Sequence, residues 1–140
     1  MKILLAVDGS AYTRRMLDYV AAHPELLGPA HDYLLCTVAA PIPPHASRFL
    51  DRATLDGYYR EQCEDVLRPL EKFIGQTGWR VQTRSLVGHA AEMIASLAAE
   101  EKVELIVMGT RGHSALGNMI LGSVTRGVIA RSSCPVLLIR

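Results

Sequence analysis

A glycine-rich stretch in the last third of the chain holds the residues best suited to chemistry. Gly109, Gly112 and Gly122 surround a loop that leads into a predicted helix, and Ser123 follows the last glycine. Glycine lets a backbone turn sharply and approach a ligand closely. The first amides of a helix have no partner within it and attract anions together with the helix dipole. We therefore predict a phosphate-binding loop, with the hydroxyls of Ser123 and Thr125 as additional donors.

Asp8 supplies a second candidate group, a carboxylate placed directly after the apolar run that opens the chain. The turn that follows, Gly9-Ser10-Ala11-Tyr12, lacks the Gly-x-Gly-x-x-Gly spacing of a dinucleotide site. The lysine of a P-loop is also missing, because Ser123 follows Gly122 directly. Any nucleotide site in this chain is therefore of another type.

Five short apolar runs predict the strands that position these residues. The first, fourth and fifth are continuous, as in strands buried on both faces of a parallel sheet. The third alternates, which is typical of a more exposed strand near a sheet edge. The runs are Lys2–Val7, Tyr33–Val38, Arg80–Val87, Leu105–Met108 and Pro135–Ile139.

Apolar residues at helical spacing fill the segments between most of these runs. Ser10 is the predicted N-cap of the first helix. A second helix, with an apolar face from Leu55 to Ile74, contains Pro69, which predicts a kink or a break. The proline-rich segment Ala39–Arg52 is predicted to be a loop. Two further helices are predicted within Ala90–Ala98 and Val124–Ile129.

This alternation of strands and helices predicts an α/β fold with a single five-stranded parallel sheet and helices on both faces. With right-handed crossovers, the simplest arrangement is the doubly wound strand order 3-2-1-4-5. Ligands bind such sheets at the carboxyl ends of the strands, where the winding reverses. Here that point lies between the first and fourth strands, so we expect Asp8 and Gly109 to be neighbours.

The composition is that of an ordinary folded domain. The chain has 140 residues, 49% of them hydrophobic and 21% charged, and residues 1–140 are predicted to form one domain. A net charge of +1 gives little support to nucleic-acid binding. No apolar run has the length of a signal peptide or of a membrane helix. Three widely spaced cysteines without a Cys-x-x-Cys pair predict a reduced, cytoplasmic protein without a metal site.

The glycine spacing resembles the nucleotide-binding signature of the universal stress protein family. That signature is Gly, two residues, Gly, nine residues, Gly and then Ser or Thr, and here it reads Gly109, Gly112, Gly122 and Ser123. The segments Ile3–Ser10 and Ser133–Ile139 also resemble the family's first and last strands. The resemblance spans essentially the whole chain, and the long segment after the second strand is its least similar part.

The resemblance implies a Rossmann-like fold, similar to the adenine nucleotide alpha hydrolases, and an ATP-binding homodimer with a role in the stress response. It implies that Asp8 lies near the ribose and any bound Mg²⁺, and that the backbone of Val38 contacts the adenine. The last strands of the family pair in the dimer, which makes Val136–Ile139 the predicted interface. The implied nucleotide-binding residues are Ala6, Val7, Asp8, Val38, Met108, Gly109, Arg111, Gly112, Gly122, Ser123, Val124 and Thr125.

Catalysis has weak support in the sequence. Hydrolysis of ATP needs a positioned water, a base and charge compensation, and the loop offers Arg111 and hydroxyls but no lysine. We expect slow hydrolysis at best, or self-phosphorylation at Ser114, Ser123 or Thr125. His113 is expected on the loop rim rather than as a base. The alternative function is a dimeric interaction module of the same fold that binds no nucleotide.

Overall fold

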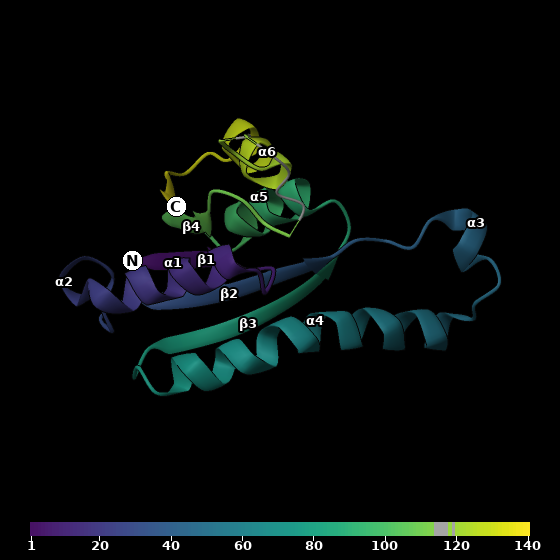
Figure 1. Ribbon diagram of the computed structural model, residues 1–140, viewed down its shortest axis with the longest axis horizontal. Helices are drawn as coiled ribbons and strands as arrows, with labels where there is room; N and C mark the ends of the chain where they lie inside the picture. The colour runs from purple at the N-terminus through teal and green to yellow at the C-terminus, as the bar shows by residue number, and fades with distance from the viewer. Residues whose placement is uncertain (114–117, 119) are drawn as a thin grey trace.

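The computed structural model describes residues 1–113, 118 and 120–140 and contains one five-stranded parallel sheet (Figure 1). The strand order is β3-β2-β1-β4-β5, which confirms the predicted doubly wound arrangement. The strands are β1 (Lys2–Ala6), β2 (Asp32–Ala39), β3 (Arg80–Val87), β4 (Leu105–Gly109) and β5 (Val136–Ile139). The predicted strand ends differ from these by at most one residue.

Helices cover both faces of the sheet, as predicted. The helices in the described residues are α1 (Ala11–Ala22), α2 (Pro24–Leu27), α3 (Pro44–Ser47), α4 (Arg52–Gly75), α5 (Ala90–Glu100) and α6 (Ser123–Arg131). One core layer joins α1, α2 and α4 to the face of β1 that carries Ile3 and Leu5. The other joins α5 and α6 to the face that carries Leu4 and Ala6. No helix in the described part of the chain is both long and apolar enough to span a membrane.

The register of the central strands brings the ends of β1 and β4 together. Ala6 lies opposite Cys36 of β2 on one side and Met108 of β4 on the other. The chain therefore leaves β1 after Ala6, two residues before Asp8, and leaves β4 after Gly109 at the same edge of the sheet. This is the point where the winding reverses, and it confirms the predicted proximity of the two segments.

Of the predicted kink or break at Pro69, the break is absent, because helix α4 runs through this residue. Proline lacks the amide hydrogen that would bond to the carbonyl four residues earlier. Both Pro69 and Asp65, whose carbonyl loses that bond, are exposed, so water can satisfy the carbonyl. The apolar face of the helix, which includes Leu67 and Leu70, holds both sides of the proline against the sheet.

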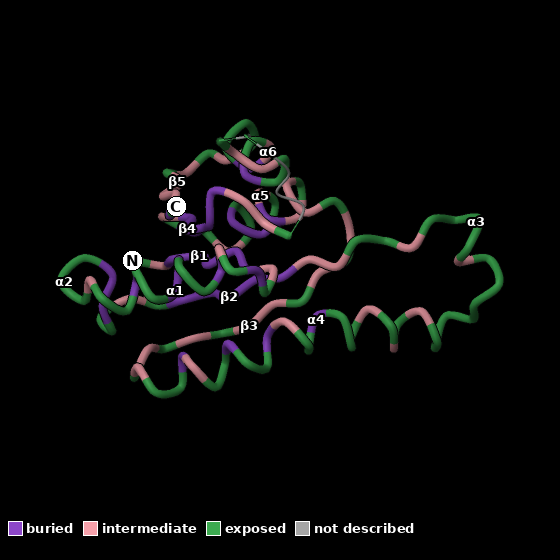
Figure 2. The backbone as a smooth tube through the Cα atoms, viewed as in Figure 1, coloured by how far each residue is buried: buried purple, intermediate pink, exposed green. Residues whose placement is uncertain are grey.

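The segment between β2 and the middle of α4 extends beyond the sheet, as Figure 2 shows. The predicted loop Ala39–Arg52 contains the short helix α3, and most of its residues are exposed. Phe49 keeps 77% of its surface exposed. The amide of Ile42 donates to the hydroxyl of Tyr59 at 2.9 Å and ties the extended segment to α4.

Candidate functional site

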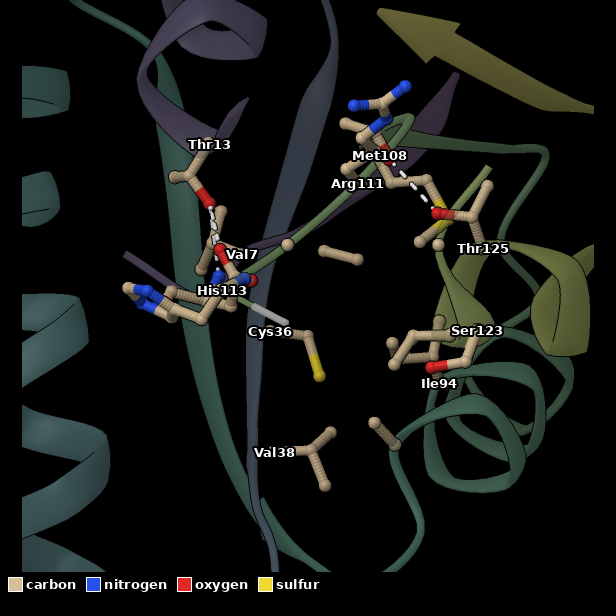
Figure 3. Close-up of a pocket in the computed structure, with 17 residues that line it drawn as sticks. Val7, Thr13, Cys36, Val38, Ile94, Met108, Arg111, His113, Ser123 and Thr125 are labelled. Atoms are coloured by element: carbon tan, nitrogen blue, oxygen red, sulfur yellow. Dashed lines mark hydrogen bonds between the residues drawn. The ribbon is translucent and has the colours of Figure 1, made fainter. Parts of the chain in front are cut away.

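A pocket of about 210 Å³ opens at the carboxyl ends of β1, β2 and β4, beside the starts of α5 and α6 (Figure 3). All twelve residues that the sequence indicated lie around it: Ala6, Val7, Asp8, Val38, Met108, Gly109, Arg111, Gly112, Gly122, Ser123, Val124 and Thr125. Sequence reasoning missed five other lining residues: Thr13, Cys36, Ala90, Ile94 and His113. Elements far apart in the sequence therefore converge on one cavity.

Asp8 anchors one wall of the pocket through several hydrogen bonds. Its Oδ1 accepts from the amide of Ser10 and from the hydroxyl of Thr13, each at 2.9 Å. Its Oδ2 accepts from the amide of His113 at 3.1 Å. Partial burial alone would raise the pKa of Asp8, but these hydrogen bonds outweigh it and hold the pKa below its usual value. The carboxylate is therefore a fixed negative charge at neutral pH.

The glycine loop closes directly over this carboxylate. A Cβ atom at Gly112 would overlap Oδ2 of Asp8, so only glycine fits there without displacing the loop. At Gly109, a Cβ atom would lie 2.8 Å from Cβ of Tyr12 on α1. Glycine is required at both positions because the backbone passes close to other parts of the protein, and the expected close approach to a ligand stays a prediction.

The start of α6 differs from the prediction in two donors. Gly122 is the N-cap and Ser123 the first helical residue, but the Gly122 amide donates to the carbonyl of Thr110 at 2.8 Å. It is therefore not a free donor. The Thr125 hydroxyl is also engaged, because its buried side chain points back to the loop carbonyls of Gly109, at 3.1 Å, and Thr110, at 3.3 Å.

Three amides at this helix start precede the first hydrogen bond within α6, which runs from the Arg126 amide to the Gly122 carbonyl. They belong to Ser123, Val124 and Thr125, and all three residues line the pocket. An α-helix leaves its first amides unpaired, and these attract anions together with the helix dipole. The helix start therefore keeps three of the four amides expected to face an anion, and the amide of Gly122 is the one that is engaged elsewhere.

Part of the pocket lining is apolar and includes Val38 of β2 and Ile94 of α5. Figure 3 shows Cys36 between Val7 and Val38, and Ile94 beside Ser123. Burial raises the pKa of the Cys36 thiol to about 12, so the thiol stays neutral. The helical spacing of apolar residues predicts that Ile94 faces the core, and Ile94 does pack there. This spacing alone does not predict that the same part of α5 also lines the pocket.

The described lining of the pocket contains two basic side chains and one carboxylate. The basic side chains are those of Arg111 and His113, and the carboxylate is that of Asp8. Within residues 1–113, 118 and 120–140, no three His, Cys, Asp or Glu side chains gather to form a metal site. Ser114, a predicted phosphorylation position, lies outside the described residues.

The lowered pKa of Asp8 predicts a specific loss of stability in acid. Its contribution to the free energy of unfolding is complete above the ordinary value of 3.8 and disappears as the pH falls through the lower value of the folded state. Chemical unfolding between pH 6 and pH 2 should therefore show a steeper acid decline for the native protein than for Asp8→Asn. Parallel curves for the two proteins would contradict this assignment.

Comparisons with known proteins agree with this architecture. The family model described as the universal stress protein family matches residues 1–140. A universal stress protein from Thermus aquaticus is 36% identical, over 99% of this chain and 97% of its own length. The solved structure of protein MJ0577, from Methanocaldococcus jannaschii, superposes with a TM-score of 0.83 at 30% identity and covers 99% of this chain and 94% of its own.

Two further solved structures carry nucleotides. One is described as a universal stress protein in complex with cAMP, with a TM-score of 0.71 at 21% identity over 100% of this chain and 97% of its own. The other, from Archaeoglobus fulgidus, is described as a complex with dAMP, with a TM-score of 0.65 at 22% identity over 100% and 98%. At these identities the likeness concerns the fold. Together with the match over residues 1–140, these findings show that the chain belongs to the universal stress protein family.

Proposed function

We propose that this protein binds an adenine nucleotide in the pocket between β1 and β4 and acts as a nucleotide-dependent regulator in the stress response. The observation that carries the proposal is the meeting of Asp8, the glycine loop and the start of α6 around one cavity. The relatives described as complexes with cAMP and dAMP support an adenine nucleotide as the ligand class.

Each part of a bound nucleotide would meet a different part of the pocket lining. The base would lie against the apolar side chains of Val38 and Ile94, and the ribose near the carboxylate of Asp8. The phosphates would lie along Gly109–Gly112 and accept hydrogen bonds from the amides at the start of α6 that precede its first helical hydrogen bond. Arg111 would offset part of their negative charge.

A magnesium ion fits this arrangement only as a companion of the nucleotide. Mg²⁺ prefers oxygen ligands and is usually held by one or two carboxylates together with substrate phosphates and water. Asp8 supplies one carboxylate, and its Oδ2 accepts one hydrogen bond from the described residues. Nucleotide phosphates and water would therefore complete the coordination.

Titration calorimetry with ATP, ADP, AMP and cAMP, each with Mg²⁺, tests the proposal. We expect saturable binding of at least one of them, and we expect mass spectrometry to find an adenine nucleotide in the purified protein. An absence of binding at millimolar concentrations of all four would contradict the proposal and favour the interaction module without bound nucleotide.

Turnover of a bound ATP should be slow. Among the described residues, the pocket lining contains no lysine, and its one carboxylate, Asp8, is held by three hydrogen bonds to the loop and to the start of α1. Phosphoryl transfer to water needs a positioned base and charge compensation, and a carboxylate engaged in this way is a weak base toward water. Self-phosphorylation at Ser123 is open to test by mass spectrometry after incubation with ATP. Thr125 is a poor acceptor because its hydroxyl is buried.

The exposed edge of β5 supports the second part of the proposal, that the protein forms a dimer. β5 ends the sheet and pairs only with β4 among the described strands. Its other edge therefore presents open backbone groups between partly buried apolar side chains, and pairing with a second copy would cover them.

Light scattering on a dilution series tests the dimer directly. We expect a molar mass of twice the 15.3 kDa of the chain. Because alternate residues of a strand bond to opposite sides and Ile139 bonds toward β4, the backbone of Leu138 faces the open edge. Leu138→Pro should therefore shift the mass to 15.3 kDa. A native protein of that lower mass at micromolar concentration would contradict the dimer.

A further inference from the structure

We infer that His113 is a positioning residue that holds the glycine loop over Asp8 and so raises the affinity of the pocket, an inference that rests on the proposed function. His113 contacts Asp8 at two points. Its amide donates to the carboxylate Oδ2 at 3.1 Å, and its ring Nε2 lies 2.7 Å from the carbonyl oxygen. Any residue can make the first contact, but only a suitable side chain can make the second.

The chemistry of the second contact defines the state of the ring. A backbone carbonyl only accepts hydrogen bonds, so the Nε2 atom of His113 must carry the proton. The imidazole therefore donates from Nε2 to the carbonyl of Asp8, just beyond the end of β1. That His113 is not a catalytic base stays a prediction, and the contact with Asp8 gives the side chain a positioning role.

The loop between β4 and α6 is attached on two sides of the pocket. On the α6 side, the Gly122 amide and the Thr125 hydroxyl hold the carbonyl of Thr110. On the β1 side, the described contacts are those between His113 and Asp8. The residues between these attachments include Arg111 and Gly112, both of which line the pocket. Their positions relative to a bound nucleotide depend on both attachments.

Loss of the ring contact should weaken nucleotide binding without unfolding the protein. The exposed side chain of His113 adds no buried surface to the core. Without its ring contact, the loop would spend part of its time away from Asp8, and the apparent affinity falls with the fraction of protein that is ready to bind. The free energy that one neutral hydrogen bond contributes corresponds to a change in affinity of about threefold to tenfold.

Three variants test this inference through two independent measurements. His113→Ala removes the ring contact, His113→Gln replaces it with an amide N–H donor on a side chain of similar reach, and His45→Ala is the control at an exposed histidine of α3. Calorimetry with AMP and with ATP, each with Mg²⁺, gives the affinity. Amide hydrogen exchange at residues 109–113 of the ligand-free proteins reports the loop attachment without any nucleotide.

We expect His113→Ala to bind about threefold to tenfold more weakly and to exchange its loop amides faster, with a melting temperature lowered by no more than a few degrees. His113→Gln should recover most of both properties, and His45→Ala should match the native protein. Equal affinity and equal exchange in His113→Ala would overturn the inference, as would a failure of glutamine to restore either. If the native protein binds no nucleotide, both the proposed function and the predicted effect of His113 on affinity are wrong. Hydrogen exchange of the ligand-free proteins then still shows whether the His113 ring holds the loop.

Discussion

Gly112→Ala is expected to abolish measurable nucleotide binding while the sheet and its two core layers remain folded. A methyl group at this position would overlap Oδ2 of Asp8, which is itself held by Ser10, Thr13 and the loop amide of His113. The carboxylate cannot turn away without breaking these bonds, so the loop must move instead. Calorimetry with ATP and AMP should show at least a hundredfold loss of affinity, about 2.7 kcal/mol.

Gly57→Ala is the matched control for this substitution. Gly57 lies inside α4, away from the pocket, and an added Cβ atom would meet nothing within 4 Å. Alanine there should leave the affinity unchanged and stabilise the helix by about 0.5–1 kcal/mol. Unchanged binding by Gly112→Ala would show that the loop does not close over Asp8 when nucleotide binds. Gly122→Val is a second probe, because its Cβ would lie 3.3 Å from Cα of Arg111.

Asp8→Ala is expected to lower both the stability of the protein and its affinity for nucleotides. The substitution leaves the Ser10 amide, the Thr13 hydroxyl and the His113 amide without their shared acceptor. Hydrogen bonds to a charged group contribute about 1.5–3 kcal/mol each, and these three are not additive because they share one carboxylate. We expect a loss of about 2–3 kcal/mol in the free energy of unfolding, measured by urea titration.

Asp56→Ala provides the control for the loss of a carboxylate. Asp56 is exposed on α4, and its removal should change the free energy of unfolding by less than about 0.5 kcal/mol. The nucleotide affinity of Asp56→Ala should remain at the native value. The affinity of Asp8→Ala should fall at least tenfold, because this substitution removes both the carboxylate proposed to lie near the ribose and the acceptor of the His113 amide. Equal stability of the two variants would show that Asp8 does not organise the turn and the loop.

The arrangement of the sheet could be predicted because each strand carries its own signal. The continuous apolar runs of β1 and β4 reflect burial on both faces, and the alternation in β3 reflects its place at the edge. The strand order then follows from the handedness of the crossovers and the short connections. Helix α4 continues through Pro69 because the packing of its apolar face outweighs the local preference of proline for a helix end.

The pocket residues at strand ends could be predicted, but the hydrogen bonds among them could not. Asp8 and His113 are 105 residues apart, and no local pattern shows that one would bond to the other. The Thr125 hydroxyl was expected to face a ligand and instead turns toward the loop, since a buried hydroxyl must find an acceptor. The residues contributed by α5, such as Ile94, depend on how the helix lies across the sheet.

A crystal structure grown with excess ATP and Mg²⁺ tests the central claim most directly. We predict density for the base against Val38, for the ribose beside Asp8, and for a phosphate within hydrogen-bonding distance of the Ser123 and Val124 amides. The glycine loop should keep its contact with Asp8. A pocket filled by the protein's own side chains under these conditions, or a nucleotide bound elsewhere with these amides facing water, would contradict the claim.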